Sequence, residues 1–415
     1  MTAAAPSLGE ALDGLLRFGT MMLRAGDTVF RVRESMGLLA ANMGLDSLAL
    51  HVTIDGMTAT VRRGPEAVTT AIEIAPLGIN ASRISALERL ARDSRPGLTV
   101  AGLAASLDAI DKAPPFNSIP VVAIAIGFAS GAFCYLNSGD PLGIAAAIAA
   151  GSLGQLARSL MFGRRLNQYA VTALCAILAS GFYCLLVVGI AGADFSPSHA
   201  VGLISSVLFL VPGFPLVASL LDLLQHQTMA GLARLAYGMM ALLAAAFGLS
   251  AVVAIAGLTA VSPEPVVQDV DVLTLLLRAV ASFAGGCGFA ILYNSSPRTV
   301  LVVGCLALLG NELRLWLHDL GMQLPPATFL GALVVGLLAS LVRSGMGVPR
   351  IVLTVPSIII MTPGIYAFHT VVFFNQGDVL SAIEAGGTCG FIVGAMALGL
   401  AAARFISDRK WMVER

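Results

Sequence analysis

Long apolar stretches alternate with short polar connections from about residue 118 to the end of the chain. Ten such stretches cover about 118–136, 142–161, 169–190, 200–221, 231–258, 273–293, 298–317, 327–342, 351–373 and 383–405. A helix of about 20 apolar residues crosses the hydrocarbon core of a bilayer, since each residue adds about 1.5 Å. The pattern therefore predicts ten transmembrane helices in a mainly α-helical protein.

The first 116 residues follow a different pattern, and no apolar run there is long enough to span a bilayer. LGEALDGLLRFGTMMLRAG and DTVFRVRESMGLLAANMG have helical periodicity, and Asp27 is the expected N-cap of the second helix. LALHVTIDGMTATVRR alternates around Asp55-Gly56, which predicts a hairpin, and VTTAIEIAP predicts a third strand. NASRISALERLARD and TVAGLAASLDAIDKA predict two more helices. We therefore expect a small α+β domain over residues 1–116.

Composition supports an integral membrane protein. Hydrophobic residues make up 57% of the chain, charged residues only 12%, and the mean hydropathy is +0.88. Soluble domains carry about 25% charged residues. The zero formal net charge gives no basic surface for a nucleic acid. The six cysteines lie in apolar stretches without CxxC spacing, so we expect neither a metal site, nor a disulfide, nor a cofactor.

Charge asymmetry predicts the orientation of the helices. The connections after spans 1, 3, 5, 7 and 9 contain no Lys or Arg. The opposite side holds Arg164, Arg165, Arg234, Arg298, Arg343, Arg350, Arg409, Lys410 and Arg415. Because basic connections stay in the cytoplasm, both termini are expected there.

Two proline-glycine pairs interrupt the apolar spans at corresponding places. Aligning Pro212-Gly213 with Pro363-Gly364 matches VPGFPLVASLLDLLQHQ to TPGIYAFHTVVFFNQGD and places Gln225 opposite Gln376. Spans 2 and 7 carry a second match, GQLAR and GNELR. These matches predict two five-helix repeats, 117–260 and 273–406. Because five is an odd number, the second repeat enters the membrane from the other side.

A helix break inside a membrane needs a physical reason, because unpaired backbone groups are tolerated there only against protein or a water-filled cavity. A single proline kink is equally explained by helix packing. A symmetric pair at the bilayer midplane instead suggests a shared cavity where backbone groups bind a substrate. Pro212, Gly213, Pro363 and Gly364 are therefore candidate substrate-binding residues.

Several stretches together resemble the threonine/serine exporter (ThrE) family. LRAGDTVFRVRESMGLLAANMGL, HVTIDGMTATVRR, ASRISALERLARD and LVPGFPLVASLLDLLQHQTMAGLARL are similar to its YjjP-type half. VPRIVLTVPSIIIMTPGIYAFHTVVFF is similar to its YjjB-type half. The resemblance covers nearly the whole chain. It implies a secondary transporter of the bacterial inner membrane that exports small polar metabolites: threonine and serine in fused chains, or succinate in split ones.

Two titratable side chains within the spans are candidates for proton coupling. Glu312 lies near the middle of span 7, where a carboxylate is costly and therefore a functional candidate. A structural ion pair with Arg278 or Arg158 is the alternative. His369, six residues after Pro363, is the second candidate, and a hydrogen-bonding role in packing is its alternative.

Further polar residues are candidates for binding substrate. Gln155 and Arg158 share a helix face, as do Asn311 and Arg314, and guanidinium groups bind carboxylates through two hydrogen bonds. Membrane anchoring explains Arg158 equally well. Asp222 and Gln225 lie at the cytoplasmic mouth after the first break, and Asp222 is a candidate for binding the ammonium group of a substrate. Gln225 and Gln376, its counterpart in the second repeat, are further candidates for substrate binding. A solvated helix end is the alternative for Asp222.

Two functions from different classes remain open from the sequence. An amino-acid exporter is favoured over a dicarboxylate exporter only by the fused form of the chain. A membrane-anchored hydrolase would need a catalytic group such as Ser35, His51 and Asp55 in the first domain, and no known hydrolase motif supports it. We therefore expect no enzyme activity. The sequence leaves open whether the chain forms a homo-oligomer.

The topology predicts that the connection from Ser262 to Val272 faces outward. In a variant without native cysteines, Glu264→Cys should react with a membrane-impermeant thiol reagent in intact cells, and Arg343→Cys should react only after lysis. Protection of Cys at position 264 in intact cells would contradict the proposed orientation.

Overall fold

The computed structural model describes residues 7–53, 55–74, 78–162, 164, 166–190, 192, 195–258, 271–408 and 411. Arg165, Arg409, Lys410, Arg415 and most of the connection around Glu264 lie outside these residues. The chain forms two compact units. The first comprises Met1–Pro115, Ala218–Leu235 and Arg343–Val352, and the second comprises Phe116–Val217, Ala236–Val342 and Leu353–Arg415.

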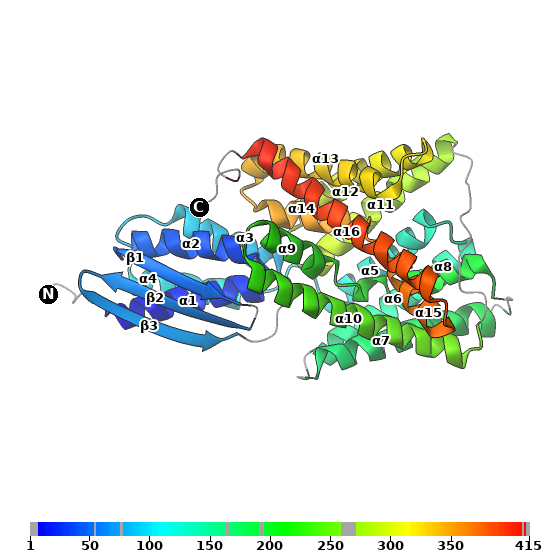
Figure 1. Cartoon of the computed structure of the whole chain (residues 1–415), viewed down its shortest axis with the longest axis horizontal. Helices are drawn as coiled ribbons and strands as arrows, with labels where there is room; N and C mark the ends of the chain where they lie inside the picture. The colour runs from blue at the N-terminus through cyan, green and yellow to red at the C-terminus, as the bar shows by residue number, and fades with distance from the viewer. Residues whose placement is uncertain are drawn as a thin grey trace. The chain divides into compact units, whose positions relative to one another are not determined.

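The N-terminal part of the first unit has the predicted order of helices and strands (Figure 1). Its elements are α1 (Leu8–Arg24), α2 (Val29–Asn42), β1 (Ser47–Val52), β2 (Gly56–Arg63), β3 (Glu66–Glu73), α3 (Ala81–Asp93) and α4 (Val100–Lys112). The three strands form an antiparallel sheet in the order β1-β2-β3. The hairpin predicted at Asp55-Gly56 is confirmed by the pairing of Val52 with Met57.

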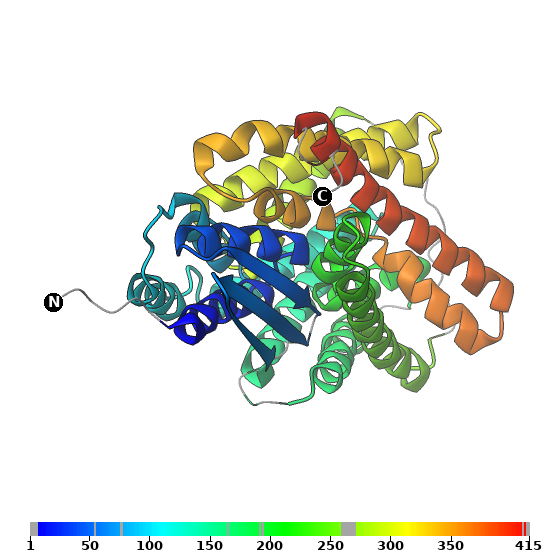
Figure 2. The same ribbon diagram turned by 60° about the vertical axis from the view of Figure 1, so that its left-hand side comes forward.

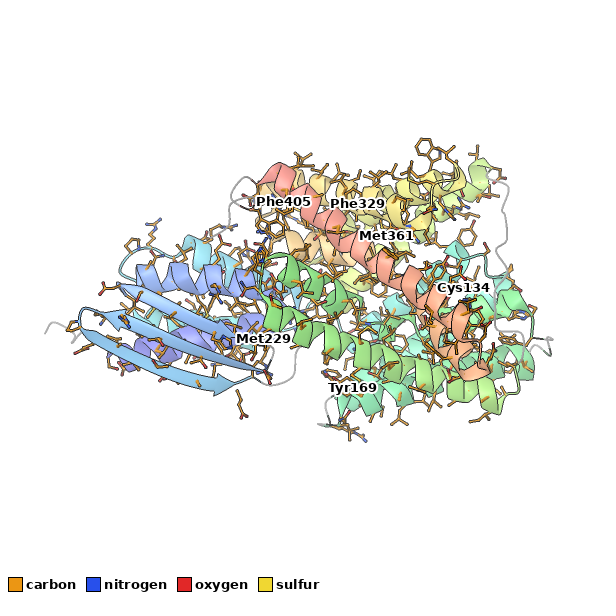
Figure 3. All side chains as sticks on the ribbon, viewed as in Figure 1. Cys134, Tyr169, Met229, Phe329, Met361 and Phe405 are labelled. Carbon is orange, nitrogen blue, oxygen red and sulfur yellow. The ribbon has the colours of Figure 1, made fainter. Side chains whose placement is uncertain are left out.

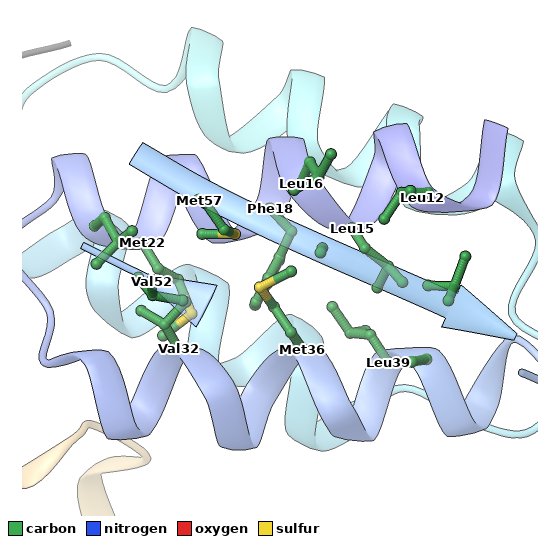
Figure 4. Packing of buried hydrophobic residues seen from close by; sticks show 14 of the residues in the cluster. Leu12, Leu15, Leu16, Phe18, Met22, Val32, Met36, Leu39, Val52 and Met57 are labelled. Atoms are coloured by element: carbon green, nitrogen blue, oxygen red, sulfur yellow. The ribbon is translucent and has the colours of Figure 1, made fainter. Parts of the chain in front are cut away.

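One face of this sheet packs on the first two helices. Alternate residues of β2 are buried, namely Met57, Ala59 and Val61, as the period of a half-buried strand requires. Figure 4 shows Met57 among Phe18 and Met22 of α1 and Met36 of α2. A strand that is apolar on one face and polar on the other can form a core with helices on that face only.

The start of α2 differs from the prediction. Thr28, not Asp27, occupies the N-cap position, and the Thr28 side chain makes no capping hydrogen bond. Asp27 is completely buried, accepts a hydrogen bond from the amide of Thr28 at 2.8 Å, and pairs with Arg31 at 2.9 Å. Sequence spacing could not reveal the true cap, because the carboxylate that accepts the hydrogen bond of the first helical amide, Val29, is that of the distant Asp222.

The remaining described helices give eight long apolar spans, and ten when each of two bent pairs is counted as one span, as predicted. Eight long apolar helices are α5 (Ile119–Leu136), α6 (Pro141–Phe162), α7 (Gln168–Cys184, continued by the π-helix η1, Leu185–Ile190), α10 (Thr228–Ile255), α11 (Val272–Leu292), α12 (Pro297–Asp319), α13 (Leu324–Met346) and α16 (Val379–Ser407). Two bent pairs complete the set: α8 (Pro197–Ser206) with η2 (Leu208–Leu210) and α9 (Gly213–Leu224), and α14 (Arg350–Ile359) with α15 (Gly364–Gln376).

The surface of the second unit suits a lipid environment. Large apolar side chains such as Phe128, Phe247 and Phe391 are more than half exposed on the spanning helices. Side chains also fill the space between the helices (Figure 3), where Met361 is completely buried. The chain is thus a multi-pass membrane protein with a small N-terminal α+β domain.

The helices of the two halves correspond along the chain. The starts of α12 and α13 follow those of α6 and α7 by 156 residues, from Pro141 to Pro297 and from Gln168 to Leu324. The starts of α15 and α16 follow those of α9 and α10 by 151 residues, from Gly213 to Gly364 and from Thr228 to Val379. α15 and α16 lie side by side in both ribbon views (Figures 1 and 2).

Close helix contacts repeat at the same offsets. A Cβ on Gly248 of α10 would lie 2.5 Å from the carbonyl oxygen of Ala173 on α7. A Cβ on Gly399 of α16 would lie 2.5 Å from the carbonyl oxygen of Phe329 on α13. Small residues allow helix backbones to approach closely in membranes. Two glycines that hold equivalent helices together in the same way are strong evidence for internal duplication.

These contacts predict matched effects in the two halves. Gly248→Ala and Gly399→Ala should each destabilise the protein by about 1–3 kcal/mol, because the added methyl group meets backbone that cannot move aside. The measurement is the apparent melting temperature of the purified protein in detergent. Gly394→Ala is the control, since a Cβ there has no neighbour within 4 Å. Unchanged melting temperatures for the first two variants would contradict the proposed close packing.

Candidate functional site

The candidate site is built around the two broken spans. The first pair of helices bends by 40° and the second by 54°. The second bend lies between Ile359 and Gly364 and includes Pro363, whereas the first lies between Ser206 and Leu208, four residues before Pro212. At both proline-glycine pairs a new α-helix begins at the glycine, α9 at Gly213 and α15 at Gly364, because proline lacks an amide hydrogen and fits poorly inside a helix.

The backbone adopts the same turn at both breaks. The amide of Gly213 donates to the carbonyl of Val211, and the amide of Gly364 donates to the carbonyl of Thr362, each at 2.8 Å. Pro363, at the centre of the second turn, has φ −80° and ψ 55°. These values are close to those of an inverse γ-turn. Each break thus satisfies its own amide locally.

The flanking hydrogen bonds also match at the offset of 151 residues. Before the breaks, Val211 donates to Leu208 at 3.0 Å and Thr362 donates to Ile359 at 2.9 Å. After them, Leu216 donates to Pro212 and Ala367 donates to Pro363, both at 3.0 Å. The hydrogen bonds from Leu208 to Leu216 therefore match those from Ile359 to Ala367, whereas the preceding helices differ, since α8 ends at Ser206 before η2 and α14 continues to Ile359.

The two breaks also contact each other reciprocally. A Cβ on Gly213 would lie 3.3 Å from Cγ1 of Ile359, and a Cβ on Gly364 would lie 3.5 Å from Cδ1 of Leu208. Leu208 and Ile359 occupy equivalent positions, four residues before the two prolines. Each glycine thus faces the residue that precedes the other break. This exchange of contacts is what a two-fold relation between the repeats produces.

The space beside the breaks is small and apolar in this conformation. Leu208, Val211, Gly364 and Phe368 contribute to the lining of a cavity of about 20 Å³. A cavity of this size has room for about one water molecule. An amino acid could bind here only after the helices around the breaks move apart.

Of the two predicted arginines, Arg158 contacts the first break. Its Nη1 donates to the carbonyl oxygen of Phe209, at 3.3 Å. Gln155, one turn earlier on α6, is 5% exposed and donates from Nε2 to Ser159 at 3.1 Å. The Oε1 atom of Gln155 has no hydrogen-bond partner among the described residues. The first repeat therefore presents a guanidinium and a buried acceptor near its break.

In the second repeat the equivalent residues form a side-chain network. Arg314 donates from Nη1 to Oδ1 of Asn311 at 3.0 Å and from Nε to Thr328 at 3.1 Å. Asn311, which is 1% exposed, donates from Nδ2 to Ser282 at 2.9 Å. The predicted common face of Asn311 and Arg314 is thus confirmed. Ser282 and Thr328 were missed because each lies on a different helix in an otherwise apolar stretch.

Glu312 joins this network through a hydroxyl group. Its Oε1 accepts a hydrogen bond from Ser282 at 3.2 Å, and its side chain is half-buried. No direct ion pair of Glu312 is found among the described side chains: Arg278 pairs with Asp319 at 2.6 Å, and Arg158 bonds the carbonyl of Phe209. Glu312 is thus a partly buried carboxylate whose described hydrogen-bond partner is uncharged.

The other candidates have different surroundings. His369 packs beside Phe373, with ring centroids 5.4 Å apart. Gln225 is half-buried, and Gln376 is exposed at the end of α15. Asp222 is completely buried and accepts a hydrogen bond from the amide of Val29 at 2.9 Å. The solvated helix end considered for Asp222 is therefore wrong.

These features define a polytopic membrane protein with duplicated halves and paired broken helices, the architecture in which many secondary transporters bind substrate. Two family models cover most of the chain. "Putative threonine/serine exporter" matches residues 13–256, and "Threonine/Serine exporter, ThrE" matches residues 278–406. The chain belongs to the threonine/serine exporter family of membrane transporters.

Curated relatives are similar over different parts of the chain. A "Probable threonine/serine exporter" of Mycobacterium tuberculosis is 26% identical over 94% of this chain and 74% of its own length. A "Probable succinate transporter subunit YjjP" of Escherichia coli is 25% identical over 59% of this chain and 93% of its own length. An uncharacterised protein of Haemophilus influenzae is 30% identical over 31% of this chain and 46% of its own length. No solved structure matches the chain.

Proposed function

We propose that the protein is a secondary active transporter that exports small amino acids of the threonine/serine type across the bacterial inner membrane. The observation that carries this proposal is the pair of equivalent breaks, with the same turn and reciprocal contacts in both repeats. Paired broken helices expose backbone donors and acceptors near the midplane when their surroundings open. The proposed repeats are residues 117–260 and 273–406, with both termini in the cytoplasm.

The polar groups near the breaks suit a zwitterionic substrate. Arg158 lies against the first break, and its guanidinium can bind an α-carboxylate once it leaves the carbonyl of Phe209. Gln155 offers a free acceptor for an ammonium or hydroxyl group. In the second repeat, Asn311 and Arg314 would supply the same chemistry after their network opens. Gln225 and Gln376 are proposed as further substrate-binding residues, and His369 as a second residue for proton coupling.

A dicarboxylate is the second candidate substrate. Two guanidinium groups at equivalent positions, Arg158 and Arg314, could bind one carboxylate each. The succinate transporter name of the Escherichia coli relative points the same way, although that relative matches only the first part of the chain. The family to which the whole chain belongs favours the amino acid.

We propose no catalytic role for the N-terminal domain. Asp55 accepts a hydrogen bond from Thr53 at 2.7 Å next to the hairpin turn. His51 is exposed on β1, and Ser35 is buried on α2. A hydrolytic group needs a nucleophile, a base and an orienting acid in hydrogen-bond contact. No hydrogen bond joins these three residues among the described side chains.

Counterflow of labelled metabolites in proteoliposomes tests the function and the breaks together. Wild-type protein should exchange threonine or serine, whereas replacing Pro212-Gly213 or Pro363-Gly364 by Ala-Ala should abolish exchange, because a continuous helix pairs the backbone groups internally. The added Cβ at position 364 would be in ordinary contact with Leu208 at 3.5 Å, whereas the one at position 213 would lie 3.3 Å from Cγ1 of Ile359 and require that side chain to shift slightly.

Pro215→Ala is the matched control for this experiment. It removes a proline close to the first break, but the equivalent residue of the second repeat is Tyr366, so the break does not need proline there. Exchange by this variant should remain near the wild-type rate. Normal exchange by either Ala-Ala variant would refute the proposed site, and exchange of succinate alone would favour the dicarboxylate.

Glu312 is the proposed proton carrier. Its carboxylate has a hydroxyl partner but no described ion pair, so it can gain and lose a proton without breaking one. Glu312→Gln should abolish export driven by a pH gradient while leaving substrate exchange at equilibrium. Ser282→Ala, which removes only the hydroxyl partner, should retain gradient-driven export. If Glu312→Gln retains gradient-driven export, the carboxylate does not couple protons.

A further inference from the structure

The segment Ala218–Leu235, which comprises most of α9 and the start of α10, belongs to the same compact unit as the N-terminal domain. This segment contributes two charged residues to the interior of that unit. Asp222, near the end of α9, is 0% exposed, and Arg234, in the second turn of α10, is 2% exposed. Charges so deeply buried are costly unless they are paired and hydrogen-bonded. Their partners therefore indicate what the two residues do.

Asp222 caps a helix of the N-terminal domain. Its Oδ1 accepts a hydrogen bond at 2.9 Å from the amide of Val29, the first residue of α2. The domain's own N-cap residue, Thr28, makes no side-chain capping bond. A carboxylate at a helix N-terminus satisfies an unpaired amide and interacts favourably with the helix dipole. The first amide of α2 is thus capped by a carboxylate from a broken membrane span.

Arg234 holds the chain just before that helix. It donates from Nη1 to the carbonyl of Gly26 at 3.1 Å and from Nη2 to the carbonyl of Asp27 at 2.8 Å. Its Nη2 also lies 3.6 Å from Oδ2 of Asp222. One guanidinium therefore joins the turn between α1 and α2 to the inner ends of α9 and α10.

A second pair of charges supports this arrangement from within the domain. Asp27 pairs with Arg31, and Arg31 also pairs with Glu88 on α3. Burial raises the pKa of the Asp27 carboxyl, and the Arg31 charge opposes that rise. The groups bonded by Asp222 and Arg234 are thus themselves fixed to α3.

The second repeat lacks these anchors. At the offset of 151 residues, Asp222 corresponds to Phe373 and Arg234 to Ala385, which carry neither charge nor capping group. The two repeats share their break geometry but differ at this point. The charges therefore do not belong to the duplicated transport scaffold; they belong to the half that carries the N-terminal domain.

We propose that Asp222 and Arg234 are positioning residues that anchor α9 to the N-terminal domain, so that the two move as one body during transport. This inference rests on the proposed transport function. α9 runs without interruption from Gly213 at the break to Leu224, so a constraint on Asp222 is carried to the break along a rigid helix. A movement of the domain would then move α9 and the first break with it. The second broken span has no equivalent charge pair.

Hydrogen exchange measured by mass spectrometry tests the anchor without reference to transport. In Asp222→Ala, amides at the start of α2 and at the end of α9 should exchange about tenfold faster or more, because both lose a buried charged bond. Asp222→Asn keeps an oxygen acceptor and should retain much of the protection. Met229→Ala, at a 64% exposed position near the start of α10, is the control and should match wild type. A change confined to one of the two segments would overturn the proposal.

Counterflow by the same variants tests whether the anchor matters for transport. Asp222→Ala should lower the maximal exchange rate about tenfold with little change in KM, since the residue positions a helix and does not contact substrate. If the Asp222→Ala protein cannot be purified, Arg234→Lys replaces it. This variant keeps the positive charge but lacks the two parallel donors of a guanidinium, so it should also lower the maximal rate with little change in KM. A wild-type maximal rate in both variants would refute the proposed coupling between the N-terminal domain and the first broken span. If the wild-type protein itself exchanges no substrate, the proposed function fails, while hydrogen exchange still decides the anchor.

Discussion

The absence of water inside a bilayer is the constraint on which the membrane unit depends. Every backbone amide and carbonyl there needs a protein partner, so a helix break is stable only when its groups are satisfied locally or by neighbours. Here the turns at Pro212 and Pro363 satisfy the following glycine amides, and Arg158 satisfies the carbonyl of Phe209. Because these bonds are few and local, a substrate can exchange with some of them at modest cost.

Duplication preserved the backbone of the breaks but not their polar surroundings. Arg158 bonds a backbone carbonyl at its break, whereas Arg314 bonds the side chains of Asn311 and Thr328. The same divergence separates Asp222 from Phe373. Backbone geometry is maintained by the membrane and by close glycine contacts, whereas side chains are free to specialise. The two halves can therefore have unequal roles in binding, proton coupling and attachment to the N-terminal domain.

Sequence reasoning was most accurate where the determining interactions are local. The spans, the hairpin at Asp55-Gly56 and both breaks follow from hydropathy, strand alternation and the chemistry of proline, and all are found in the structure. It failed at Asp27, placed one position from the true N-cap, and it did not find the hydrogen-bond partner of Glu312. In both cases the partner is remote in sequence: Asp222 for the start of α2, and Ser282 for Glu312.

The sequence by itself determined the membrane class, the positions of the long apolar helices and the repetition of a broken helix, because hydrophobic burial and backbone hydrogen bonding depend on neighbours within a few residues. Only the tertiary structure decided which charges meet. Asp222 and Val29 are 193 residues apart, and no periodicity could have joined them. A buried charge is stabilised by whichever groups the fold brings within about 3 Å, and that depends on how helices pack rather than on where they begin.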